Sequence, residues 1–172
     1  MVNKCGSCQV CCELLQIEEI NKPDFKICPN QFYGGCKIYE ERPASCRVYE
    51  CSWLRNGESE KNRPDRVGVL FSDQYSPLYG EWTTIHVIKP EARSLDRIKK
   101  KILEIIKRTV LIEMTKEGMV LLGGPENRVH EMISRIEKQG GKLTADGLVV
   151  QADSLSFQKS NQLIPKSRLI RA

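Results

Sequence analysis

Near its N-terminus the sequence reads Cys5-Gly6-Ser7-Cys8-Gln9-Val10-Cys11-Cys12, and this run is followed by Cys28, Cys36, Cys46 and Cys51. These are all eight cysteines of the chain, and the 121 residues after Cys51 contain none. Cysteines spaced by two residues form the small turn in which both sulfurs point at one ion. Eight thiolates fit two tetrahedral sites of four cysteines each, the closed coordination typical of structural zinc. We therefore expect all eight cysteines to bind metal, and two zinc ions to be bound.

Iron is the alternative metal. The spacing from Cys5 to Cys11 is that of bacterial ferredoxins, and Cys28 precedes Pro29 as the fourth ferredoxin ligand precedes a proline, although Cys28 is remote here. Thiolate-rich sites accept both metals, so iron or a 4Fe–4S cluster stays open, with disulfide or free-thiol redox chemistry as a third reading. Adjacent Cys11 and Cys12 cannot easily ligate one ion. They serve two sites or a bridging site, or one of them is a spare packing cysteine.

Composition and charge place the chain among globular proteins. Of its 172 residues 40% are hydrophobic and 28% charged, with a net charge of +5. Residues 1–60 carry a net charge of −2 and the remainder +7, which permits weak attraction of nucleic acid to the back half. With no secretory apolar segment and no run of 18 apolar residues, we expect no membrane contact and a cytoplasmic location. In a reducing cytosol clustered thiols bind metal more often than they form disulfides.

The predicted organisation is a cysteine-rich metal-binding module over residues 1–60, a small α+β domain over 66–153 and a basic, mobile tail over 154–172. The first segment is loop-rich with few apolar residues, so we expect it to be stabilised by metal, which supplies on the order of 10–16 kcal/mol in small zinc modules. The polar run 55–66 indicates the boundary.

The second segment predicts an antiparallel sheet with two helices on one face. Strands are expected at 66–71 and 82–88, and a helix after Pro90 whose apolar stripe comprises Leu95, Ile98, Ile102, Ile105, Ile106 and Val110. Hairpins are expected around Glu117-Gly118 and over 142–150, separated by a helix that opens at Gly124-Pro125-Glu126 and ends at Gly140-Gly141.

The cysteine pattern, continued by Gly35-Cys36-x-Ile38-Tyr39-x-x-Arg42-Pro43-x-x-Cys46 and Cys51-Ser52-Trp53, resembles the YkgJ-type family of zinc- or iron-chelating proteins, named for its CxxCxxCC motif. The resemblance covers residues 5–54. It implies metal chelation by these cysteines. A similar module occurs in flagellin lysine methylases, so the resemblance also implies, as a second reading, an iron–sulfur protein in a protein-methylation or other modification system.

Around the cysteines, Arg42 is expected to donate to sulfur or to backbone carbonyls and to offset thiolate charge, and Pro43 to set the turn before Cys46. His86 and His130 are interpreted as packed or solvated histidines. The basic residues of 97–108 form a solvated helix side or, as an alternative function, a nucleic-acid-binding surface. No catalytic constellation stands out apart from the metal site, and a protein partner is expected.

Overall fold

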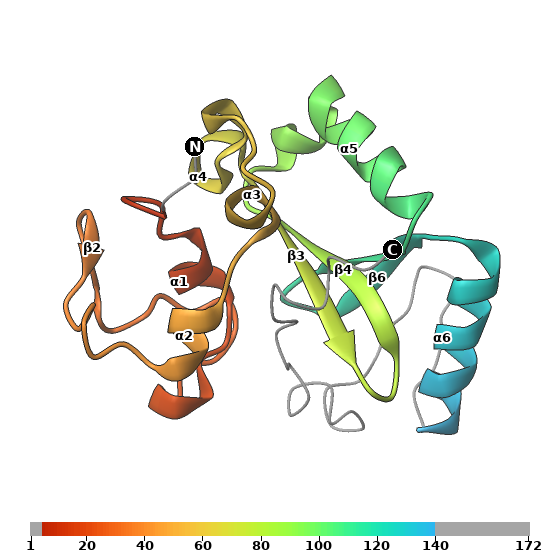
Figure 1. The fold of residues 1–172 in the computed structure, drawn as a ribbon, viewed down its shortest axis with the longest axis horizontal. Helices are drawn as coiled ribbons and strands as arrows, with labels where there is room; N and C mark the ends of the chain where they lie inside the picture. Colours follow the sequence, from red (N-terminus) through yellow and green to blue (C-terminus); the bar gives the residue numbers. More distant parts are fainter. Residues whose placement is uncertain (1–4, 140–172) are drawn as a thin grey trace.

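The computed structural model describes residues 5–139 and begins with short elements connected by loops (Figure 1). The elements of this first part are α1 (Val10–Leu14), η1 (Glu18–Ile20), β1 (Gln31–Phe32), β2 (Gly35–Cys36), α2 (Ala44–Val48), α3 (Ser52–Arg55), η2 (Glu60–Asn62) and α4 (Pro64–Val67). The prediction of a loop-rich front segment is confirmed. Of the two glycines before Cys36, Gly34 has a positive φ of 86° and makes the β1–β2 turn.

A four-stranded sheet follows, in the order β3 (Val69–Ser76), β4 (Gly80–Val87), β5 (Val110–Met114) and β6 (Met119–Gly123). The outer pairs are antiparallel, but β4 and β5 are parallel, so the prediction of an antiparallel sheet is wrong. The cause is the connection between them, η3 (Pro90–Ser94) and helix α5 (Asp96–Ile106). A crossover of this length returns the chain to the starting edge, and the next strand then runs in the same direction.

The two long helices lie on opposite faces of the sheet, which corrects the prediction that they share one face. Helix α5 packs on Val69, Phe71, Ile85 and Leu111. Helix α6 (Glu126–Lys138) packs through Met132 and Ile136 on Trp82, Val110 and Ile112. Successive residues of β5 therefore enter different clusters, because side chains of a strand alternate between its faces. Both faces of β5 are covered, which explains its unbroken apolar sequence.

Element boundaries differ from the prediction mainly before β3. Strand β3 begins at Val69, because Arg66 and Val67 belong to α4. Gly68 ends α4 with a φ of 78°, and a Cβ there would lie 2.7 Å from Lys89 Cβ. The β5–β6 hairpin and the start of α6 after Pro125 are confirmed. The predicted helix end at Gly140-Gly141, the 142–150 hairpin and the 154–172 tail lie outside the described residues.

The front segment packs against the β3 edge of the sheet (Figure 1). Cys8, Val10 and Leu70 form one buried apolar cluster, with Cys51 partly buried against it. Trp53 of α3 is 4% exposed, and its indole nitrogen donates to the carbonyl of Ser59 at 3.1 Å. The cysteines are thus attached to a rigid sheet on one side. Among the helices of residues 5–139, none is long and apolar enough to cross a membrane.

Candidate metal centre

All eight predicted cysteines line one cavity of about 640 Å3. They come from separate segments: Cys5 and Cys8 from the loop before α1, Cys11 and Cys12 from α1, Cys28 from a loop, Cys36 from β2, Cys46 from α2, and Cys51 from the residue that precedes α3. All eight are free thiols. Leu70 and Gln74 of β3 complete the wall, so the cavity lies between the front segment and the sheet.

The thiols are gathered but not yet arranged as coordination spheres. Within residues 5–139, no cluster of three or more Cys, His, Asp or Glu side chains has the arrangement of a metal site. The chemistry of the donor set nevertheless fits zinc or iron, because thiolate is the preferred soft ligand of both. A metal would have to draw these sulfurs together, as it does in modules whose folding is coupled to binding.

Three thiols are in direct contact. The hydrogen bond with Cys11 lowers the pKa of Cys5 to about 7 and likewise lowers the pKa of Cys12 to about 7. The hydrogen bond with Cys12, and then that with Cys5, raises the pKa of Cys11 well above its usual value. Because a thiol carries one proton, Cys11 donates to one neighbour at a time, and the three groups share their protons as a unit. Thiolates, which are the metal-binding form, are therefore accessible near neutral pH.

Burial has the opposite effect on other cysteines. Desolvation raises the pKa of Cys8 to about 11, and burial also raises the pKa values of Cys46 and Cys51. In the metal-free protein these thiols hold their protons at neutral pH. A bound cation would reverse that preference, because a metal deprotonates the thiols that coordinate it.

Several cationic side chains lie near the thiols, among them Arg42, Lys22 and Arg63. Arg42 lines the cavity with its guanidinium carbon 4.1 Å from the Tyr39 ring centroid, and its buried Nε has no hydrogen-bond partner among residues 5–139. The charge of Arg42 contributes to lowering the pKa of Cys5. The predicted charge-offsetting role is thus compatible with its position. Pro43 directly precedes α2, which carries Cys46.

Lys22 is another of these cations, and sequence reasoning missed it. It is 3% exposed, and its ammonium donates to the carbonyls of Leu15 and Pro23. Cys11, Cys12 and Cys28 are within its electrostatic range. The only sequence signal at this position was the turn at Lys22-Pro23, which indicates nothing about a buried charge.

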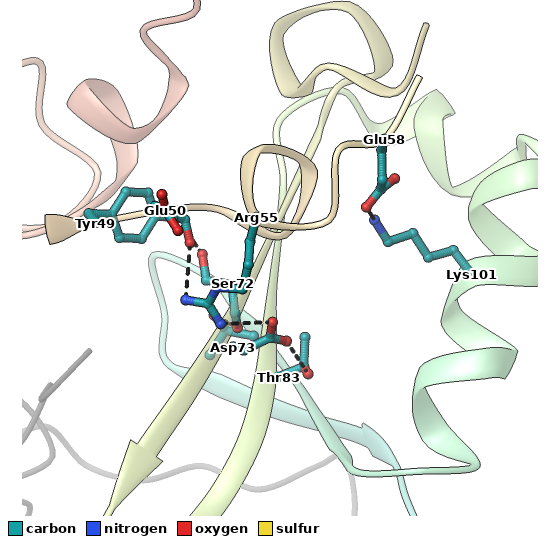
Figure 2. A network of polar contacts seen from close by, with 9 residues as sticks. Tyr49, Glu50, Arg55, Glu58, Ser72, Asp73, Thr83 and Lys101 are labelled. Atoms are coloured by element: carbon teal, nitrogen blue, oxygen red, sulfur yellow. Dashed lines mark hydrogen bonds and ion pairs between the residues drawn. The ribbon is translucent and has the colours of Figure 1, made fainter. Parts of the chain in front are cut away.

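A polar network joins the cysteine segments to the sheet (Figure 2). The hydroxyls of Tyr49 and Ser72 share a hydrogen bond, and Arg55 forms an ion pair with Asp73 at 3.2 Å. Thr83 donates to the other Asp73 oxygen at 3.0 Å. These contacts hold the segment from Tyr49 to Arg55, which contains Cys51, against β3.

The remaining predicted residues lie elsewhere. His86 is 4% exposed and packs in β4 with its ring centroid 5.8 Å from that of Phe25, whereas His130 is exposed on α6. Neither lines the cavity. Of the basic residues on α5, Lys101 forms an ion pair with Glu58 and lies 4.6 Å from the Phe71 ring centroid (Figure 2), so it faces the protein.

Comparisons with protein-family models, with curated proteins and with solved structures gave no match. The YkgJ-type resemblance consequently stays a prediction based on the cysteine pattern.

Proposed function

We propose that this protein binds zinc through its eight cysteines, in a structural or metal-handling role. The observation that carries the proposal is the single cavity onto which all eight thiols open, although the cysteines span residues 5–51 and six separate segments. Burial of apolar side chains does not by itself explain why every cysteine of the chain meets there. Metal coordination supplies that reason, because ligation offsets the cost of ordering loops that have little core.

The charges around the cavity support the same proposal. Four thiolates around one divalent ion carry a net charge of −2, which is costly to bury without a nearby cation. Lys22 and Arg42 supply positive charge next to the thiols, and Lys22 is almost fully buried. Such neighbours tune metal affinity without touching the ion.

Iron is the second candidate, because thiolate-rich sites accept iron as well as zinc and the spacing from Cys5 to Cys11 is that of bacterial ferredoxins. The roles in methylation, in nucleic-acid binding and with a protein partner rest on the resemblance and on charge alone, and they stay predictions.

Metal analysis of the full chain purified without oxygen tests the proposal. We expect two zinc ions per chain, no visible absorbance and no labile sulfide. A brown protein with labile sulfide would select the iron alternative. A folded chain that carries no metal, and takes up neither zinc nor ferrous iron under reducing conditions, would contradict both. The variant in which Ser replaces Cys8, Cys11, Cys28 and Cys46 is the negative control, because it lacks half of the proposed ligands and should bind no metal.

A further inference from the structure

We propose that the eight thiols divide into two metal sites, with the consecutive residues Cys11 and Cys12 contributing to different sites. The inference rests on the proposed function and specifies its ligands. The sheet-side group comprises Cys5, Cys8, Cys11 and Cys51, and the loop-side group comprises Cys12, Cys28, Cys36 and Cys46.

In the sheet-side group, Cys5 and Cys8 form one tight turn. The Cys8 N–H donates to the Cys5 carbonyl at 3.1 Å, and the Cys5 thiol donates to the Cys8 carbonyl at 3.4 Å. Cys8 also packs with Leu70 of β3, and Cys51 borders the same apolar cluster. Cys51 lies within electrostatic range of Cys5.

Tyr49 connects the other members of the sheet-side group. Its hydroxyl is bonded to Ser72 of β3 (Figure 2), and the thiols of Cys11 and Cys51 lie within its electrostatic range. A side chain anchored to the sheet therefore has both of these cysteines as neighbours. Cys11 in turn contacts Cys5, which closes the group.

In the loop-side group, a backbone hydrogen bond joins Cys12 to Cys28, and strand pairing places Cys36 opposite Gln31, which is bonded to Cys28. The Cys28 N–H donates to the Cys12 carbonyl at 3.0 Å, and the Gln31 N–H donates to the Cys28 carbonyl at 3.0 Å. Gln31 is the cross-strand partner of Cys36 in the β1–β2 hairpin. Cys46 completes the group, because Cys12 and Cys28 are within its electrostatic range.

Helix geometry explains how neighbours in sequence can serve two sites. Successive side chains of an α-helix point about 100° apart. Cys11 and Cys12 both lie in α1, so this helix presents one sulfur to each group. Arg42 and Arg63 lie near Cys5 of the sheet-side group, whereas Lys22 lies near Cys28 and Cys12 of the loop-side group and also near Cys11. Contact between the Cys11 and Cys12 thiols makes the two sites adjacent.

Native mass spectrometry of paired Ser variants of the full chain tests this division. Each variant is loaded with zinc and then titrated with a chelator that the wild-type sites resist, and the zinc ions that remain are counted. The within-group doubles are Cys8→Ser/Cys51→Ser and Cys28→Ser/Cys36→Ser, and each should keep one ion at wild-type affinity. The cross-group double Cys8→Ser/Cys28→Ser should keep none. The single variants Cys8→Ser and Cys28→Ser should each keep one ion, which shows that neither change unfolds the chain.

The possible failures are distinguishable. A wild type that binds no metal contradicts the proposed function itself. If the wild type binds two ions but a within-group double variant keeps none at wild-type affinity, the division is overturned and metal binding itself stands. A single polynuclear cluster that every variant loses as a whole also overturns the division.

Discussion

The guanidinium of Arg55 lies 3.2 Å from the carboxylate of Asp73, and this ion pair ties the segment that follows Cys46 and Cys51 to strand β3. The Arg55 side chain is 9% exposed and also donates to the Glu50 carbonyl at 3.4 Å (Figure 2). The pair is shielded from solvent on the arginine side, so it is stronger than an ordinary surface pair.

Replacing Arg55 by Met should lower the free energy of unfolding by about 1–3 kcal/mol, because Asp73 loses its charged partner. Urea denaturation measures the change. The matched control is Arg66→Met: the Arg66 side chain is 52% exposed and pairs with Glu60, so its loss should cost within about 0.5 kcal/mol. Equal effects of the two changes would contradict the role given to Arg55.

The Tyr49–Ser72 hydrogen bond should appear as coupling between the two residues. Tyr49→Phe and Ser72→Ala should each lower stability by about 1 kcal/mol, because each removes the same hydrogen bond. The double variant should cost little more than either single variant, which a double-mutant cycle measures. Fully additive effects would show that the hydroxyls contribute independently.

His86 should make the protein sensitive to acid. Burial lowers the pKa of His86 from 6.5 to about 4. Between these pH values His86 is therefore protonated in the unfolded chain and neutral in the folded chain. Stability due to neutral His86 is present above the unfolded pKa and is lost as pH falls toward the folded pKa, by about 2 kcal/mol between pH 7.5 and 5.

The comparison with His86→Leu isolates this effect. The stability difference between variant and wild type should shift by about 2 kcal/mol in favour of the variant from pH 7.5 to pH 5. Urea denaturation at both pH values gives the two stability differences. The difference at pH 7.5 measures the effect of the substitution on packing, and the change from pH 7.5 to pH 5 measures the proton linkage. A difference that stays constant with pH would rule out the predicted proton linkage.

Arg42 should strengthen metal binding through its charge. Arg42→Gln should weaken zinc affinity by about tenfold, because the thiolate site loses a neighbouring cation. Competition with a chromophoric chelator measures the affinity. Arg42→Lys keeps the charge and should retain most of the affinity, whereas Arg66→Gln serves as a control away from the cavity. Unchanged affinity in Arg42→Gln would leave Arg42 a purely structural role.

Metal removal should loosen the front segment and spare the sheet. Val10 and Ile17 are among the few buried apolar residues there, whereas Val110, Leu111 and Ile112 of β5 are fully buried. Hydrogen exchange after chelation should therefore accelerate in α1, the β1–β2 hairpin and α2, with β4 and β5 still protected. Exchange unchanged in α1 would show that the segment folds without metal.

Local patterns in the sequence were sufficient for several elements. The hairpin at Glu117-Gly118 and the helix after Pro125 depend on turn residues and on spacing within a few positions, so they could be predicted. Of the predicted apolar stripe, Ile98, Ile102, Ile105 and Ile106 identified the buried face of α5, whereas Leu95 precedes the helix and Val110 belongs to β5.

The direction of β5, and the face on which each helix packs, could not be read from such patterns. A fully buried strand has apolar residues on both sides, so Val110, Leu111 and Ile112 do not indicate which helix covers which face. The antiparallel sheet with both helices on one face was wrong for this reason.

Which residues supply thiols could be predicted, because cysteine identity and close spacing are local properties of residues 5–51. The three-dimensional fold was needed to show that all eight line one cavity, that Lys22 is buried beside them, and that Tyr49 and Arg55 anchor them to β3. These relationships join residues far apart in the chain. They depend on how loops close onto the sheet, which no spacing between cysteines encodes.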